Sequence, residues 1–258
     1  MDIVEHEVAG GVPEFLGLLR GYPGPVWIYR GQADRSWELV PKAGRVECYS
    51  PEWEEKRAAD PSLPPRDLGR FRAWCQQAVA HADSLPDDPF ECLAYAQHYG
   101  LATRLLDWTT NPLVALYFAA DTHEDVDGLV YCHLPGYNVN TEVAGLDWDY
   151  PRPPRYTPRP FDQRVIAQQA VFTYHSQPQA PLCPASPADV LASLAPGGVD
   201  LVRPVIRAGL KPTILRELAC IGIDRKRLFP GLDGLSDVIN RETRESVKFA
   251  SMSDAASS

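Results

Sequence analysis

Proline is the residue that most constrains how this chain can fold. It makes up 25 of the 258 residues, about twice the share of ~5% that is usual in proteins. Because proline fixes φ and lacks an amide hydrogen, it is accepted in loops and in the first turn of a helix, but not inside helices or central strands. We therefore expect short helices that begin at proline and are joined by many loops, rather than a bundle of long helices.

The composition predicts a folded, cytoplasmic protein that does not contact a membrane. Hydrophobic residues make up 45% of the chain, which is enough for a substantial core. The longest apolar run, residues 112–120, is much shorter than the roughly 20 residues that a bilayer span requires. The first residues also lack the basic and then apolar order of a signal peptide. The net charge of -9 argues against binding of duplex nucleic acid through its phosphates.

The cysteines predict neither a disulfide framework nor a metal site. There are six of them, irregularly spaced and without a C-x-x-C pair. A chain of this length does not depend on disulfides for its stability. We expect reduced thiols and no bound metal.

Periodicity and capping patterns predict a single α+β domain over residues 1–250, followed by a disordered tail over 251–258. We expect a small mixed or antiparallel sheet flanked by helices. The expected helices are 13–19, 52–59, 66–81, 89–99, 112–120, 212–221 and 236–249, with a strand as the alternative for 112–120. The expected strands are 26–30, 128–134, 165–175 and 201–207, and long loops are expected over 135–164 and 177–187.

Two clusters of polar residues lie in apolar surroundings and are candidates for a site. The first, residues 96–120, contains His98, Arg104 and Asp107, which together offer a proton carrier, an anion clamp and an orienting acid. The alternative is structural: Arg104 pairs with Asp107, and Asp107 or Thr109 caps the next helix. The second cluster, residues 29–45, places Arg30 at the end of a strand and Gly31 where the chain turns or approaches a ligand.

The motifs in these clusters resemble those of the FRG domain family. They are Tyr-Arg-Gly-Gln at 29–32, Trp-Glu-Leu-Val-Pro at 37–41, Gln-His-Tyr-Gly-Leu-Ala-Thr-Arg-Leu-Leu-Asp-Trp-Thr at 97–109 and Ala-Leu-Tyr-Phe-Ala at 115–119. Later segments at 164–173 and 228–235 are also similar, so the resemblance spans roughly residues 26–240. Two family positions differ, since Ala102 stands for the usual proline and Ala170 for the usual glycine.

A more distant resemblance is to the ADP-ribosyltransferase fold. It implies that Arg30 and Gly31 bind NAD and that Tyr117 stacks on the nicotinamide. It also implies that Gln168 or Gln169 occupies the position of the late-strand glutamate. An amide can hydrogen-bond a ribose hydroxyl but brings no charge to stabilise an oxocarbenium ion, and Asp107 is the substitute carboxylate.

The leading hypothesis from these resemblances is an ADP-ribosyltransferase-like effector or toxin of a bacterial defence or toxin–antitoxin system, with NAD as its substrate. Arg30 would clamp NAD, and Gln168 would bond the ribose. His98 or Asp107 would position the acceptor, a protein or a nucleic acid, while the 135–164 loop covers the site. The residues expected to contact NAD are Gly31, Gln32, Tyr99, Thr109 and Tyr117. An antitoxin or another defence protein is the expected partner.

Two alternatives remain open from the sequence. One is a metal-independent hydrolase or nuclease, in which His98 is the base, Asp107 orients it and Arg104 stabilises an oxyanion. The other is a non-catalytic interaction module, in which both clusters form a buried polar network that specifies the fold.

Overall fold

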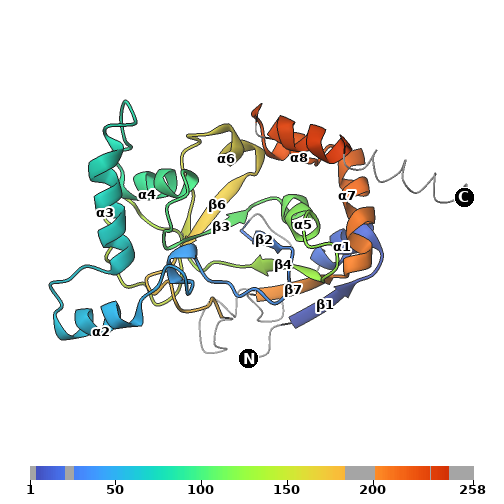
Figure 1. The fold of residues 1–258 in the computed structure, drawn as a ribbon. Coiled ribbons are helices and arrows are strands. Elements are labelled where there is room, and N and C mark those ends of the chain that lie inside the picture. The colour runs from blue at the N-terminus through green and yellow to red at the C-terminus, as the bar shows by residue number, and fades with distance from the viewer. Residues whose placement is uncertain (1–3, 21–25, 184–200, 233, 244–258) are drawn as a thin grey trace, which may run out of the picture.

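The computed structural model describes residues 4–20, 26–183, 201–232 and 234–243, and its strands form one seven-stranded sheet (Figure 1). The strand order is β1-β7-β4-β2-β3-β6-β5. The strands are β1 (Val4–Val8), β2 (Ile28–Gln32), β3 (Leu105–Thr109), β4 (Gly128–His133), β5 (Arg155–Tyr156), β6 (Ala170–Tyr174) and β7 (Leu201–Ile206). Among the strand pairs of the described residues, β1 with β7 is parallel and the others are antiparallel, so the sheet is mixed, as expected, and larger than the small sheet that the sequence predicted.

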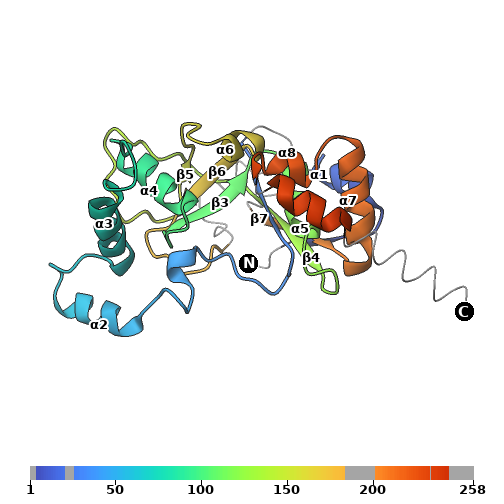
Figure 2. The ribbon, with the colours of Figure 1, turned by 45° about the horizontal axis from the view of Figure 1, so that its top comes forward.

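The sheet has a weak seam at its middle, between β2 and β3. These two strands share a single register pair, Tyr29 with Thr109, whereas β2 pairs with β4, and β3 with β6, over five residues each. Beyond that pair the two strands diverge, so that β3 and β6 lie to one side of the seam and β4 and β7 to the other (Figure 2). The seam therefore separates the sheet into two halves and leaves room for side chains between them.

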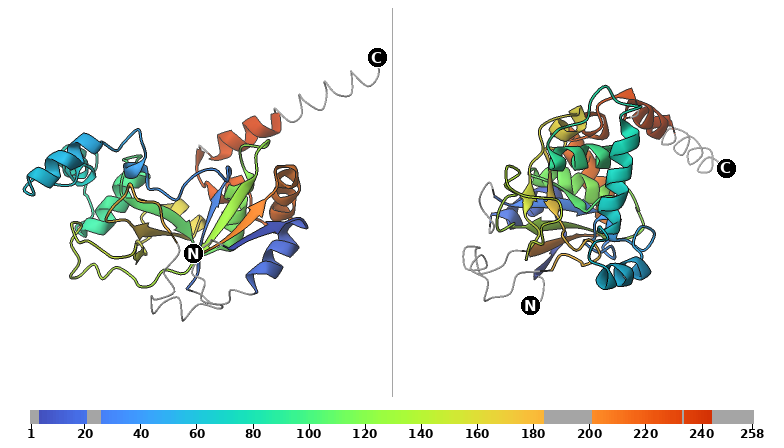
Figure 3. Two further views of the ribbon diagram at one scale, coloured as in Figure 1. Left: turned by 90° about the horizontal axis from the view of Figure 1, so that it is seen from below. Right: turned by 90° about the vertical axis from the view of Figure 1, so that its left-hand side faces the viewer.

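Helices cover the two halves separately. They are α1 (Gly11–Leu19), α2 (Pro51–Ala59), α3 (Arg66–Ala78), α4 (Pro89–His98), α5 (Pro112–Ala120), α6 (Gln163–Ala167), α7 (Lys211–Cys220) and α8 (Arg225–Leu228), and residues 234–243 are also helical. Helices α1, α5 and α7 lie over the half with β2, β4 and β7, while α3 and α4 lie beside β6 (Figure 3). Within the described ranges, no helix has both the length and the apolar character needed to cross a membrane.

Proline begins several helices, as the sequence predicted. The side chains of Ser50, Asp88 and Asn111 accept hydrogen bonds from the first turns of α2, α4 and α5, and a proline follows each of them directly. These caps satisfy backbone N–H groups that have no partner inside the helix. Residues 112–120 are therefore helical, and the alternative strand is wrong.

Other predicted boundaries were wrong. Strands β1, β3 and β5 were not predicted, β5 lies within the loop expected over 135–164, and Gly31 lies inside β2 rather than after it. The single strand expected over 165–175 is instead the end of α6 followed by β6, because the backbone reverses at Gln169, whose φ is +47°. The last helix begins before residue 236, while residues 244–249, the 251–258 tail and the end of the 177–187 link lie outside the described residues.

Candidate functional site

A cavity of about 270 Å³ lies at the seam of the sheet. Strands β2 and β3 supply one part of its wall, and segments far away in the sequence supply the rest. It is lined by Tyr29, Arg30, Gly31, Asp107, Trp108, Thr109, Phe118, Gln168, Ala170 and Phe229. The seam thus brings together Arg30, Gly31, Asp107, Thr109 and Gln168 from the predicted site.

Arg30 places a charged donor in this seam. Its Nη1 donates to the backbone oxygen of Asp107 at 2.7 Å and lies 3.8 Å from the Asp107 carboxylate. Its Nε is buried and has no acceptor among the described residues. Burial lowers the pKa of Arg30, against the opposing charge of Asp107, yet a guanidinium remains protonated in proteins. Arg30 is therefore a half-buried cation at the cavity wall, and a guanidinium in such a place is the kind of group that binds an anion or a carbonyl oxygen.

Asp107 is held in place by Gln97, a residue of the 97–109 motif to which the sequence assigned no role. Gln97, in the last turn of α4, donates from Nε2 to Asp107 Oδ1 at 2.7 Å. The Gln97 side-chain oxygen accepts from the Thr103 hydroxyl, so its amide nitrogen must face Asp107. The Asp107 side chain is 64% exposed. Gln97 therefore orients a carboxylate that is accessible from solvent.

Gln168 and Thr109 join the seam to neighbouring segments. Gln168 ends α6, and its Nε2 donates to the carbonyl oxygen of Leu228 at 3.0 Å. The Thr109 hydroxyl donates to the Gln168 carbonyl at 2.6 Å and accepts from the Asn111 amide. Gln168 thus lies just before β6 rather than in a strand, and the predicted cap of α5 by Asp107 or Thr109 is wrong because Asn111 provides it.

The aromatic side of the cavity comes from Phe118 and Phe229, whose rings meet edge to face with centroids 6.0 Å apart. The guanidinium of Arg225 lies over Phe229 at 4.8 Å and fixes its position from behind. Tyr117, which the resemblance implied as the stacking residue, does not line this cavity. It is buried in the core, and its hydroxyl donates to Asp121 at 2.7 Å. Successive residues of a helix point about 100° apart, so α5 presents Phe118 and not Tyr117.

His98 and Tyr99 do not line the cavity either. His98 Nε2 lies 3.5 Å from Asp162, and its ring packs against Phe161. Tyr99 is 64% exposed and packs against Tyr95 on the outer side of α4. The predicted combination of His98 with Asp107 is therefore not assembled, because Asp162 occupies the partner position.

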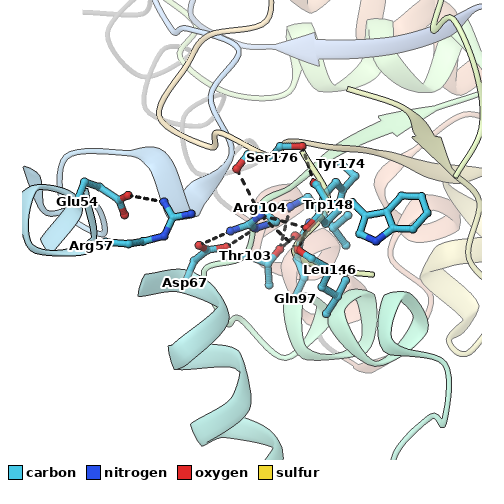
Figure 4. Close-up of polar contacts among 11 residues, drawn as sticks. Glu54, Arg57, Asp67, Gln97, Thr103, Arg104, Leu146, Trp148, Tyr174 and Ser176 are labelled. Carbon is cyan, nitrogen blue, oxygen red and sulfur yellow. Dashed lines mark hydrogen bonds and ion pairs between the residues drawn. The ribbon is translucent and has the colours of Figure 1, made fainter. Parts of the chain in front are cut away.

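Arg104 is buried in a structural network, shown in Figure 4. Its Nε and Nη2 donate to the two oxygens of Asp67 at 2.6 and 2.7 Å, and Nη1 donates to the Tyr174 hydroxyl at 3.1 Å. Burial acts to lower the pKa of Arg104, but the hydrogen bonds and charge of Asp67 outweigh it and raise that pKa. The predicted ion pair between Arg104 and Asp107 is wrong, and Arg104 does not reach the seam cavity.

Gly31 lines the cavity and is also required by the packing of α5 on β2, whereas Gln32 does not line the cavity. A Cβ atom on Gly31 would lie 1.8 Å from the backbone oxygen of Ala115, so the close approach that requires glycine is to α5. Gln32 is 3% exposed, and its side-chain oxygen has no donor among the described residues. In the same ranges, no group of three or more His, Cys, Asp or Glu side chains is placed to hold a metal ion.

A buried histidine near Arg30 predicts acid sensitivity. His175 Nε2 lies 2.9 Å from the Thr173 hydroxyl, and burial, together with the charges of His133, Arg30 and Arg104, lowers its pKa to about 3. The unfolded chain takes up a proton near pH 6.5 and the folded chain does not, so the stability that neutral His175 contributes is lost as the pH falls below 6.5. We expect this residue to account for about 2–3 kcal/mol of lost stability between pH 7 and pH 4.5.

Urea denaturation at the two pH values measures this effect. The His175→Gln variant should lose less stability on acidification than the wild type, and the exposed His81→Gln control should behave like the wild type. Equal losses in all three proteins would contradict the buried neutral state of His175.

Comparison with known proteins identifies the N-terminal part of this site. Residues 25–128 match the FRG domain. This match agrees with the resemblance that the Tyr-Arg-Gly motif indicated, and β2, α4, β3 and α5 lie within the matched residues. Compared with curated proteins and with solved structures, the chain shows no significant match. Gln168 and Phe229, which complete the cavity, lie beyond the matched residues.

Proposed function

We propose that the seam cavity binds NAD and that the protein is an ADP-ribosyltransferase-like enzyme. The observation that carries this proposal is Arg30, a half-buried cation at the wall of a cavity that also contains aromatic rings and a carboxylate. A phosphate or a carboxamide oxygen of NAD would accept from Arg30. Phe118 and Phe229 would pack against the planar nicotinamide ring.

The size of the cavity favours one half of the dinucleotide. Its volume of about 270 Å³ is slightly below the ~300–1,000 Å³ of sites that enclose drug-sized ligands. We assign the cavity to the nicotinamide ribose of NAD and place the adenosine half of the dinucleotide outside the cavity. When the bond between the nicotinamide nitrogen and the ribose breaks, positive charge develops on the ribose, and Asp107 is the lining carboxylate that can stabilise it. Gln97 would act as a positioning residue for Asp107.

The proposal also covers the acceptor of the ADP-ribose group and the regulation of the enzyme. The acceptor would be a protein or a nucleic acid, and the protein would act as an effector or toxin held in check by an antitoxin or defence partner. The exposed Asp107 carboxylate lies where an acceptor could approach the ribose from solvent.

Substitution of Arg30 tests the binding step. We expect both Arg30→Ala and Arg30→Lys to weaken NAD binding at least about 30-fold, because removing one member of a buried charged contact costs ~2 kcal/mol or more and lysine lacks the planar fork. Isothermal titration calorimetry with NAD measures this, and circular dichroism checks the fold. Arg216→Ala removes an exposed arginine from α7 and should bind like the wild type. Unchanged affinity in both Arg30 variants would overturn the proposed site.

A non-catalytic NAD-binding or ADP-ribose-binding module is the second candidate, favoured by one observation. Gln168 stands where an acid is expected, and its amide is committed to the Leu228 carbonyl. Release of nicotinamide in the presence of cell protein and RNA separates the two functions. In a transferase, Asp107→Asn should retain NAD binding and lose nicotinamide release; in a binding module the wild type itself binds and releases none.

A further inference from the structure

The thiols of Cys75 and Cys92 are neighbours although nothing in the sequence pairs them. Cys75 lies in α3 and Cys92 in α4, which lie side by side (Figures 1 and 2). Their sulfur atoms are 3.7 Å apart. A disulfide has a sulfur–sulfur distance of about 2.05 Å, so the two atoms must approach by about 1.7 Å. Rotation of the two side chains and a small shift of the helices can supply this movement.

We propose that Cys75 and Cys92 form a site of reversible oxidation, at which a peroxide converts the two thiols into a disulfide between α3 and α4. The two sulfurs differ in access. Cys92 is 6% exposed and packs in the core of this half, whereas Cys75 is half-buried. Hydrogen peroxide therefore reaches Cys75 first. Burial and the adjacent Cys75 raise the pKa of Cys92 to about 12, which also makes Cys92 the slower of the two to react with peroxide.

The reaction balances in two steps. The Cys75 sulfur attacks one oxygen of hydrogen peroxide, the oxygen–oxygen bond breaks, and a sulfenic acid and one water form. The Cys92 sulfur then attacks the sulfenic sulfur, and the displaced hydroxide takes up the Cys92 proton as the second water. Two thiols are oxidised and one peroxide is reduced. No cofactor is required, and a small dithiol reverses the reaction.

The bond would connect the two polar networks described above. Helix α3 carries Asp67, which holds Arg104, and α4 carries Gln97, which orients Asp107. The disulfide closes the loop over residues 75–92 and restricts the unfolded chain, so oxidation should raise the melting temperature by several degrees. This inference does not depend on NAD binding.

The sequence around the pair makes the test specific. No lysine or arginine lies between Arg72 and Arg104, so both cysteines fall in one tryptic peptide, residues 73–104. The full chain is treated with hydrogen peroxide at neutral pH, its free thiols are alkylated, and the unreduced protein is digested. We expect this peptide to carry no alkyl group and to weigh two hydrogens less than its reduced form. After dithiothreitol it should carry two alkyl groups, and the melting temperature should return to its starting value.

Variants separate this pair from the other cysteines. Cys75→Ser and Cys92→Ser should each abolish both the mass change and the shift in melting temperature, whereas Cys183→Ser, which removes an exposed cysteine, should leave both intact. Comparing the wild type before and after dithiothreitol gives the same information if a variant fails to fold. A peptide 73–104 that remains fully alkylated after peroxide, or that carries only a sulfinic acid at Cys75, would overturn the proposal.

Discussion

Replacing Asp67 by alanine should destabilise the protein by about 3–5 kcal/mol, because it leaves the buried Arg104 guanidinium without its counter-ion. Arg104 is 2% exposed, and both oxygens of Asp67 accept from it. The Tyr174 hydroxyl and two more distant carbonyls cannot replace a negative charge. Urea denaturation at pH 7 measures the loss.

Two further variants make this result specific. Glu54→Ala removes one side of a half-exposed ion pair with Arg57 and should cost less than about 1 kcal/mol. The double variant Asp67→Ala with Arg104→Met removes the unpaired charge and should recover part of the stability lost in Asp67→Ala. A loss in Asp67→Ala no larger than that in Glu54→Ala would contradict the buried ion pair.

The predicted ion pair of Arg104 with Asp107 was wrong, and it shows where reasoning from the sequence fails. Arg104 and Asp107 are three residues apart, and on a helix they would be neighbours. Residues 105–109 form a strand instead, so side chains an odd number of residues apart point to opposite faces. The actual partner, Asp67, lies in α3, 37 residues earlier. The strand itself forms by pairing with β6, a contact between distant segments that the local pattern does not contain.

Local signals, by contrast, predicted the helices that carry the site. The acid and proline at 88–89 and the amide and proline at 111–112 begin α4 and α5 because capping involves only residues within one turn. The seam was not predictable, because it depends on β2 and β3 sharing a single register pair. Phe229 and Gln97 fall within the segments that resemble the FRG family, but they reach the site through tertiary packing, so their roles there could not be derived from a local pattern.

Replacing Gly31, the glycine of the Tyr-Arg-Gly motif, should cause the second large loss of stability. A Cβ atom at position 31 would lie 1.8 Å from the Ala115 oxygen and 2.6 Å from the Ala119 nitrogen, both backbone atoms of α5 that cannot rotate away. We expect Gly31→Ala to cost about 3 kcal/mol or more, because α5 must move off β2 and give up its packing in the core. Thermal and urea denaturation measure this loss.

Gly17 provides a control of opposite sign. It lies inside α1, and a Cβ atom added there would meet no neighbouring atom within 4 Å, so Gly17→Ala should stabilise the protein by ~0.5–1 kcal/mol through its helix propensity. If Gly31→Ala were as stable as the wild type, α5 could not lie against β2 as described.

Side chains alternate along a strand, so Gly31 allows α5 to pack on one face of β2, while Arg30 directs its guanidinium toward Asp107 in the seam. The two adjacent residues of the motif therefore have separable effects: substitution of Gly31 should reduce stability, whereas substitution of Arg30 should reduce binding in a protein that still folds.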